Sequence, residues 1–152
     1  MHYKKSLYFL LAFFIIGLLY TNIGFNIAYQ TRLFIGYFLL IAYLVGAVSF
    51  VYRPIADDSR LKKHFFVRLA ALLAVILINI VPYALLNQQH DSLGAGYLLY
   101  FTSIGLGSLL GMYMLIETIV LATRKQYDRV IINFTLAEAV YCFLLFSNLF
   151  GF

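Results

Sequence analysis

Residues Tyr97 to Thr123 read YLLYFTSIGLGSLLGMYMLIETIVLAT, and Glu117 is the only charged side chain among them. A helix needs roughly 20 apolar residues to cross about 30 Å of hydrocarbon, and this stretch is long enough. Inside a bilayer the backbone has no water to bind, so the segment must satisfy its own hydrogen bonds as a helix. We therefore interpret it as a transmembrane helix.

The rest of the chain contains four further segments of this kind. They are Ser6 to Gly24, Leu33 to Tyr52, Val67 to Leu86 and Val130 to Phe150. Of the 152 residues, 64% are hydrophobic and 11% charged, whereas ordinary globular chains have roughly 45–50% and about 25%. So small a globule could not bury this apolar surface, which excludes a soluble enzyme. We predict an all-α integral membrane protein with a single transmembrane domain over residues 1–152, a bundle of five helices joined by short loops.

The distribution of Lys and Arg predicts the orientation of this bundle. With the N-terminus in the cytoplasm, the outer side holds only Arg32. The cytoplasmic side then holds Lys4, Lys5, Arg53, Arg60, Lys62, Lys63, Arg68, Arg124, Lys125 and Arg129. Because cytoplasmic loops carry the excess of basic residues, we expect a multi-pass protein of the plasma membrane, of the bacterial inner-membrane kind. Five crossings place Phe152 outside.

The first segment follows a short basic stretch, as a secretory signal does. A cleavable signal has small residues before the cut, and Asn26 occupies such a position. We therefore expect a retained membrane anchor. Polar residues between Asn22 and Arg32 supply turn chemistry, so we expect a tight hairpin between the first two helices.

Glu117 and Glu138 are acidic side chains deep inside apolar segments. An acidic group there costs roughly 2.5–3.5 kcal/mol on insertion scales and is a candidate functional residue by default. At about 1.5 Å per residue, Glu117 lies roughly 10 Å from Arg124 and Glu138 roughly 13 Å from Arg129. We expect both at nearly one level, facing each other or sharing a cavity, where they should not both be ionised. Three interpretations stay open: a proton or cation site, carboxyls that only stabilise helix packing, and pairing with a partner subunit.

Small residues mark one face of the helix that carries Glu117. Ser103, Gly107 and Gly111 recur every four residues, a spacing that lets two membrane helices approach closely. We predict helix packing at these three positions, either within the protein or between copies of it.

Asn79 is a third candidate ligand for an ion or a proton. It lies about 16 Å along the helix from Arg68, near the middle of the bilayer. Pro82 has no N–H and frees a backbone carbonyl near Ile78 and Asn79, and freed carbonyls in broken membrane helices can coordinate ions. The alternative is that Pro82 only kinks the helix.

The connection from Arg53 to Arg68 concentrates basic residues, with Asp57, Asp58 and Ser59 available to cap a helix. The basic side chains Arg60, Lys62, Lys63 and Arg68 are candidates for docking anionic lipid headgroups or an acidic partner. The simpler interpretation is that they only determine orientation.

Motifs for a reaction are missing from the sequence. His2, His64 and His90 lie apart, no HExxH or GxSxG occurs, and a single cysteine, Cys142, excludes a Cys-pair zinc site. We therefore expect no catalytic residues, no metal and no cofactor, with an intramembrane enzyme as a remote alternative. The bilayer is one expected partner; a homo-oligomer or another membrane protein is the other, and nucleic acid is not expected.

Two functional hypotheses follow from these residues. The first is a small membrane transport or channel-like component in which Glu117 and Glu138 bind a proton or cation. The alternative is a non-catalytic accessory, assembly or immunity-type protein that acts by binding another membrane protein, for which the glycine face is the motivating feature.

Overall fold

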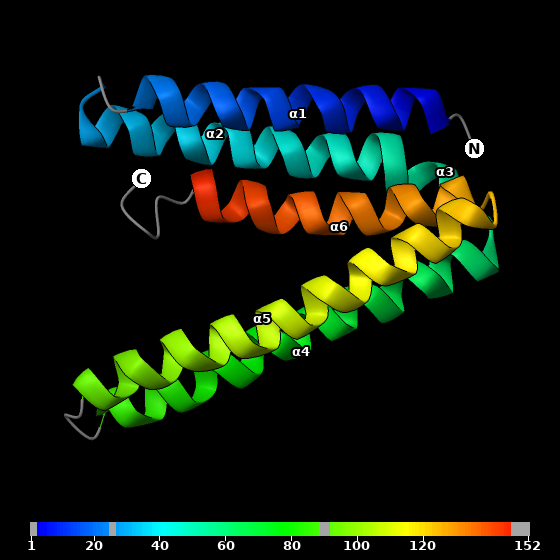
Figure 1. Ribbon diagram of the computed structural model, residues 1–152. Helices are drawn as coiled ribbons and strands as arrows, with labels where there is room; N and C mark the ends of the chain where they lie inside the picture. The colour runs from blue at the N-terminus through cyan, green and yellow to red at the C-terminus, as the bar shows by residue number, and fades with distance from the viewer. Residues whose placement is uncertain (1–2, 25–26, 89–91, 147–152) are drawn as a thin grey trace.

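The computed structural model describes residues 3–24, 27–88 and 92–146, which are almost entirely helical (Figure 1). In chain order the elements are α1 (Tyr3–Gly24), α2 (Tyr29–Ala47), the π-helical turn η1 (Val48–Tyr52), α3 (Arg53–Ile55), α4 (Ser59–Gln88), α5 (Ser92–Thr123) and α6 (Tyr127–Phe146). Within the described ranges no strand occurs. Five helices are long and apolar enough to cross a membrane, one of them formed by α2, η1 and α3 together. The prediction of an all-α fold with five such helices is confirmed.

Most of the predicted connection between the second and third segments is helical. The sequence places the start of the third helix at Val67, whereas α4 begins at Ser59. The Asp58 carboxylate accepts hydrogen bonds from the backbone N–H of Arg60 at 2.8 Å and of Leu61 at 3.2 Å. This confirms the predicted acidic cap, and the capped helix continues through polar turns that hydropathy assigns to a loop. At the other end of the chain, residues 147–150 of the fifth predicted segment lie outside the described residues.

Helix α6 occupies the centre of the molecule and contacts α1, α2, α4 and α5 (Figure 1). One apolar core lies between α1, α2 and α6 and includes Tyr43, Cys142 and Phe146, all fully buried. A second, smaller core joins Ile55 and Met114 to α6. The helices α4 and α5 pair along their lengths and diverge from the three-helix unit away from this second core (Figure 1). The molecule is therefore a three-helix unit and a hairpin joined at one end.

The π-helical turn follows from Pro54. Because proline has no N–H, it cannot donate to the carbonyl four residues earlier, which belongs to Phe50. The buried hydroxyl of Ser6 on α1 donates to this carbonyl at 2.8 Å. The hydrogen bond satisfies the freed acceptor and ties α1 to the irregular end of α2.

Close helix contacts occur at glycines of α2. A Cβ added at Gly36 would overlap the Phe146 carbonyl and lie 2.8 Å from the Tyr20 hydroxyl oxygen. A Cβ at Gly46 would overlap the ring of Phe9. Since these neighbours belong to α1 and α6, glycine at both positions lets the three-helix unit pack closely.

A tight turn joins α5 to α6. Lys125 adopts a left-handed conformation with φ of 56°, its N–H bonds to the Ala122 carbonyl at 3.0 Å, and the Gln126 N–H bonds to the Leu121 carbonyl at 2.9 Å. These are the two bonds of a Schellman C-cap. The turn brings the end of α5 next to the start of α6 and so places Glu117 close to α6.

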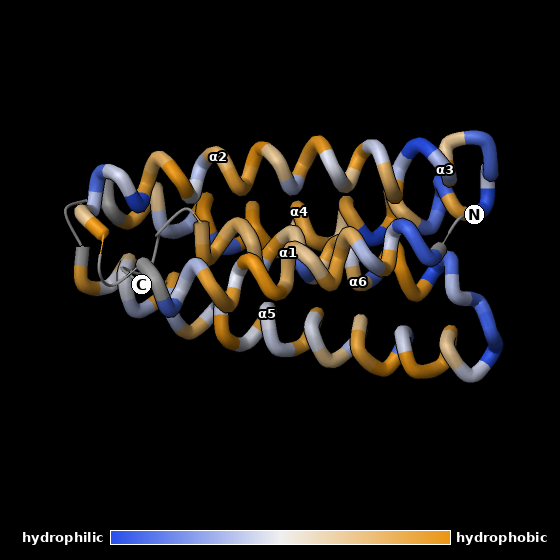
Figure 2. The backbone as a smooth tube through the Cα atoms, turned by 90° about the horizontal axis from the view of Figure 1, so that it is seen from above, coloured by the Kyte–Doolittle hydropathy of each residue, from blue (hydrophilic) through white to orange (hydrophobic). Residues whose placement is uncertain are grey.

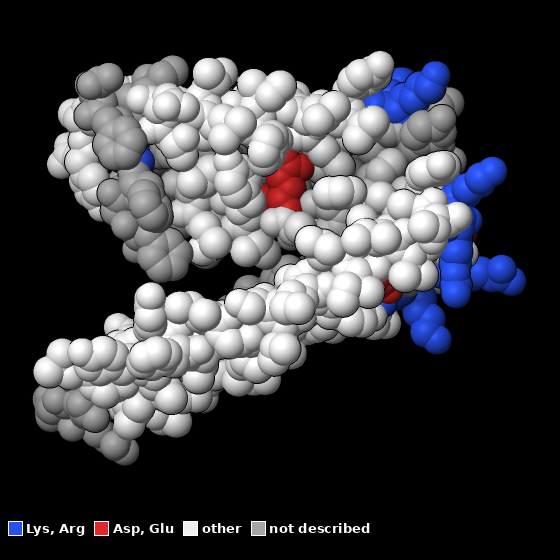
Figure 3. Space-filling view, in the orientation of Figure 1, with Lys and Arg blue, Asp and Glu red and all other residues white. Residues whose placement is uncertain are grey.

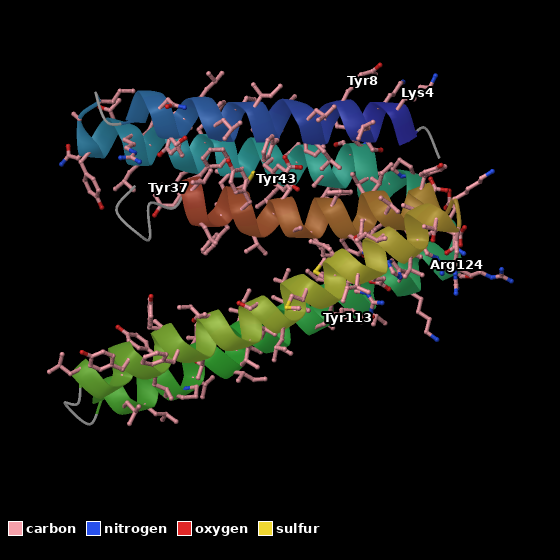
Figure 4. All side chains as sticks on the ribbon, viewed as in Figure 1. Lys4, Tyr8, Tyr37, Tyr43, Tyr113 and Arg124 are labelled. Atoms are coloured by element: carbon pink, nitrogen blue, oxygen red, sulfur yellow. The ribbon has the colours of Figure 1, made fainter. Side chains whose placement is uncertain are left out.

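Basic side chains gather at one end of the bundle. Blue atoms in Figure 3 lie mainly at the end where α1 begins and α5 meets α6, and Lys4 and Arg124 are labelled there in Figure 4. The hydropathy colouring of Figure 2 shows the same separation, with hydrophilic backbone concentrated at that end. Arg32 lies near the opposite end, buried, with its guanidinium carbon 5.6 Å from the centre of the Tyr20 ring.

Candidate functional site

Glu117 forms an ion pair with Arg68 across the α4–α5 hairpin. Arg68 Nε donates to Glu117 Oε2 at 2.8 Å, and Arg68 Nη2 pairs with Glu117 Oε1. The two side chains are only 15% and 17% exposed. The guanidinium carbon also lies 5.1 Å from the centre of the Tyr113 ring, which is labelled on α5 in Figure 4. Bidentate contacts between arginine and a carboxylate are among the stronger charge-assisted hydrogen bonds in proteins.

Asn133 extends this ion pair to α6. Its side-chain amide donates to Glu117 Oε2 at 3.0 Å and lies 3.3 Å from the Thr118 hydroxyl oxygen. The side-chain amide oxygen of Asn133, Oδ1, lies 3.1 Å from His64 Nε2 on α4. Asn133 is 1% exposed, so these contacts replace water. We call Arg68, Glu117, Asn133 and His64 the polar cluster; it joins α4, α5 and α6 where the hairpin meets the three-helix unit.

The polar cluster neutralises Glu117 with the molecule's own groups. One positive charge and one amide already bind the carboxylate oxygens. A free cation would have to displace Arg68, whose side chain is only 15% exposed. Glu117 therefore fits a packing role better than an ion-binding role.

Glu138 does not meet Glu117, and the expected pairing of the two carboxyls is not formed. Glu117 approaches α6 at Asn133, whereas Glu138 is five residues further along the same helix. At about 100° and 1.5 Å per residue, five residues turn the side chain by roughly 140° and advance it about 7.5 Å. Glu138 thus faces α1 on the other side of α6.

Glu138 lies in an apolar groove between α1 and α6. The groove has a volume of about 480 Å³, and its lining residues are Leu7, Leu10, Leu11, Phe14, Phe134, Ala137, Glu138 and Tyr141. The Glu138 Oε1 atom is buried, and none of the described residues donates a hydrogen bond to it. In the middle of the view in Figure 3, a patch of acidic atoms is surrounded by uncharged side chains. We call this pocket the Glu138 groove.

The predicted mid-membrane site at Asn79 is a helix–helix contact in the structure. Asn79 donates from its amide to the Val75 carbonyl at 2.7 Å, and the Ser103 hydroxyl donates to Asn79 Oδ1 at 3.3 Å. Asn79 and Arg68 are eleven residues apart on α4, about 16 Å. Asn79 is therefore separate from both carboxyls and connects α4 to α5.

The two predicted packing glycines face an open groove. A Cβ added at Gly107 or Gly111 would meet nothing within 4 Å. Both glycines line a second apolar groove, about 580 Å³ in volume, between the α4–α5 hairpin and α6. Ser103 contacts α4 through Asn79, but the described helices leave the glycine face itself uncovered.

The basic candidates divide into two kinds. Arg60, Lys62 and Lys63 are exposed at the start of α4, where they can meet headgroups or a partner. Arg68 instead points at Glu117 and is not part of that exposed set.

The contact between Arg68 and Glu117 is the feature that our sequence reasoning missed, together with the roles of His64 and Asn133. The available signal was that Arg68 falls inside the third apolar segment, where a cation also needs a partner. Among the described residues, no three His, Cys, Asp or Glu side chains converge in a way that could hold a metal ion.

No protein-family model, curated protein sequence or solved structure matches the chain. The function is therefore inferred from the geometry of the two carboxyl sites.

Proposed function

We propose that this chain is a small multi-pass membrane protein that binds a proton or a cation at Glu138, as a transport or channel-like component. The observation that carries the proposal is the buried Glu138 Oε1 atom without a hydrogen-bond donor among the described residues. An unpaired buried carboxylate costs several kcal/mol, on the order of a lost ion pair. Uptake of a proton or a cation by the Glu138 carboxyl would remove this cost.

The proposal assigns different roles to the two intramembrane carboxyls. Glu117 holds α4, α5 and α6 together through Arg68 and Asn133. Glu138 lies in an apolar groove that is open at the surface of the molecule between α1 and α6. Of these two carboxyls, Glu138 is the one that lines an open groove and has no charged partner among the described residues.

The proposed orientation has the basic end of the bundle in the cytoplasm. A reporter domain placed in the α5–α6 turn near Lys125 should then be active only in the cytoplasm. Activity only on the outer side would reverse the orientation.

The two large grooves, at Glu138 and at Gly107 and Gly111, are apolar and do not supply a polar path across the bundle. A transport role therefore requires additional helices, from copies of this chain or from another membrane protein. We include this assembly in the proposal.

Proton or cation uptake by reconstituted protein tests the proposal. Liposomes that contain the protein and an internal pH-sensitive or sodium-sensitive dye are energised with a membrane potential. We expect uptake above that of empty liposomes, loss of uptake in Glu138→Gln, and retention in folded Glu117→Gln. Equal uptake in the wild type and Glu138→Gln, or no uptake by the wild type, would contradict the proposal.

A second candidate function is an accessory protein that binds another transmembrane helix in the groove at Gly107 and Gly111. The favouring observation is that an added Cβ at either glycine meets nothing within the described chain. Gly107→Leu and Gly111→Leu should then abolish recovery of a complex from native membranes, whereas Glu138→Gln should not. Unchanged complexes in both leucine variants would rule this function out.

A further inference from the structure

We propose that the cation of the Glu138 groove is organic: an alkylammonium whose charged nitrogen pairs with Glu138 and whose hydrocarbon chain lies between α1 and α6. This inference rests on the proposed function and narrows its ligand class. The groove has a single carboxylate and aromatic and aliphatic walls, and it has few oxygen ligands for a metal ion.

The groove lacks the oxygen ligands that an inorganic ion requires. Hard cations such as Ca²⁺ and Mg²⁺ bind about six or more oxygen atoms. Among the lining residues only Glu138 and Tyr141 carry a polar side-chain group, and the remaining walls are hydrocarbon. A metal ion would leave most of its coordination shell unsatisfied there.

An ammonium group has three N–H donors at most and so needs fewer partners than a metal ion, which binds about six oxygen atoms. The ammonium group can donate a charge-assisted hydrogen bond to the Glu138 carboxylate, which lines the groove and whose Oε1 atom has no donor among the described residues. Two aromatic rings also line the groove, those of Phe14 and Tyr141, with ring centres 5.8 Å apart. Aromatic faces attract organic cations.

The size and position of the groove fit a ligand with a hydrocarbon body. Its volume of about 480 Å³ falls within the range of roughly 300–1,000 Å³ that is usual for small-molecule sites. Leu7, Leu11, Phe14 and Phe134 of its lining are exposed on the outer surface of the helices. A ligand dissolved in the hydrocarbon of a bilayer can therefore reach Glu138 from the side.

Equilibrium binding of radiolabelled dodecylammonium to the full chain in phosphatidylcholine nanodiscs tests this inference, with empty nanodiscs subtracted. We expect saturable binding that neither dodecanol nor excess sodium displaces, and that Glu138→Gln weakens about tenfold or more. Leu11→Trp should also block binding because the larger side chain fills the groove and leaves the carboxyl intact. Leu18→Trp is the matched control: Leu18 is a similarly exposed leucine on α1 outside the groove.

The outcomes separate this inference from the proposed function. Absent or non-saturable dodecylammonium binding, displacement by sodium, or equal binding by Glu138→Gln would overturn the organic-cation assignment, even if uptake of protons still depends on Glu138. Saturable binding lost in Glu138→Gln and Leu11→Trp but kept in Leu18→Trp would support it, even if reconstituted protein moves no ion.

Discussion

The ion pair between Arg68 and Glu117 predicts an unusual pattern of stability among its variants. Replacing Arg68 by Met leaves the Glu117 carboxylate, which is 17% exposed, with Asn133 as its remaining donor. Removing one member of a buried ion pair typically costs about 3–5 kcal/mol, because the other charge stays buried without a partner. We expect Arg68→Met and Glu117→Met each to lower the free energy of unfolding by about this amount.

The double variant, with Met at positions 68 and 117, should recover most of the stability that each single variant loses. When both charges are replaced by apolar side chains of similar volume, no unpaired charge remains, and such replacements are often neutral or stabilising by about 1–4 kcal/mol. The variant with Met at both positions is therefore expected to be more stable than either single variant. Lys62→Met, which removes an exposed cation of the same helix, should change stability little.

Unfolding in mixed micelles with increasing dodecyl sulfate, followed by circular dichroism, measures these free energies. A double-mutant cycle then gives the coupling between the two positions. If the double variant loses as much stability as the two single variants added together, Arg68 and Glu117 are not coupled and their ion pair does not hold α4 to α5.

Three further changes test local features of the fold. Ser6→Ala leaves a freed carbonyl without its donor and should cost about 1–3 kcal/mol in the same unfolding assay, whereas Ser108→Ala on the exposed face of α5 should be close to neutral. Gly36→Ala should lower the unfolding midpoint markedly, because the added Cβ would overlap the backbone of α6. In the control Gly105→Ala the added Cβ meets nothing within 4 Å, so that change should be neutral or slightly stabilising. Equal effects of the two changes would contradict the close packing at Gly36. Lys125→Gly should raise the free energy of unfolding by about 1 kcal/mol, since glycine adopts a φ of 56° without strain; a loss of stability would argue against this turn.

The five long helices could be predicted because length and apolarity are local properties of a sequence. The same locality explains the error at the start of α4. Hydropathy marks where a chain stops being apolar, whereas a helix stops where its backbone is capped, and the cap at Asp58 lies beyond several charged residues.

The partners of the intramembrane charges could not be predicted, because they depend on how each helix is rotated about its own axis. Arg68 meets Glu117 only because α4 and α5 pair with those faces together. Helix packing shows the same limit. The spacing of Ser103, Gly107 and Gly111 favoured close contact there, yet tight contacts form at Gly36, which has no small residue four positions away, and at Gly46, which our sequence analysis did not select.

Two glutamates of equal insertion cost differ here in what surrounds them. Glu117 has its charge balanced by Arg68, whereas Glu138 has a buried oxygen without a donor among the described residues. Burial alone therefore does not identify a functional carboxyl in a membrane helix; an unsatisfied buried oxygen beside open space is the more discriminating sign. We therefore expect Glu117→Gln mainly to lower the free energy of unfolding and Glu138→Gln mainly to weaken ligand binding. Measuring both properties in both variants distinguishes the two roles, because a general disturbance of the bundle would lower stability and binding together.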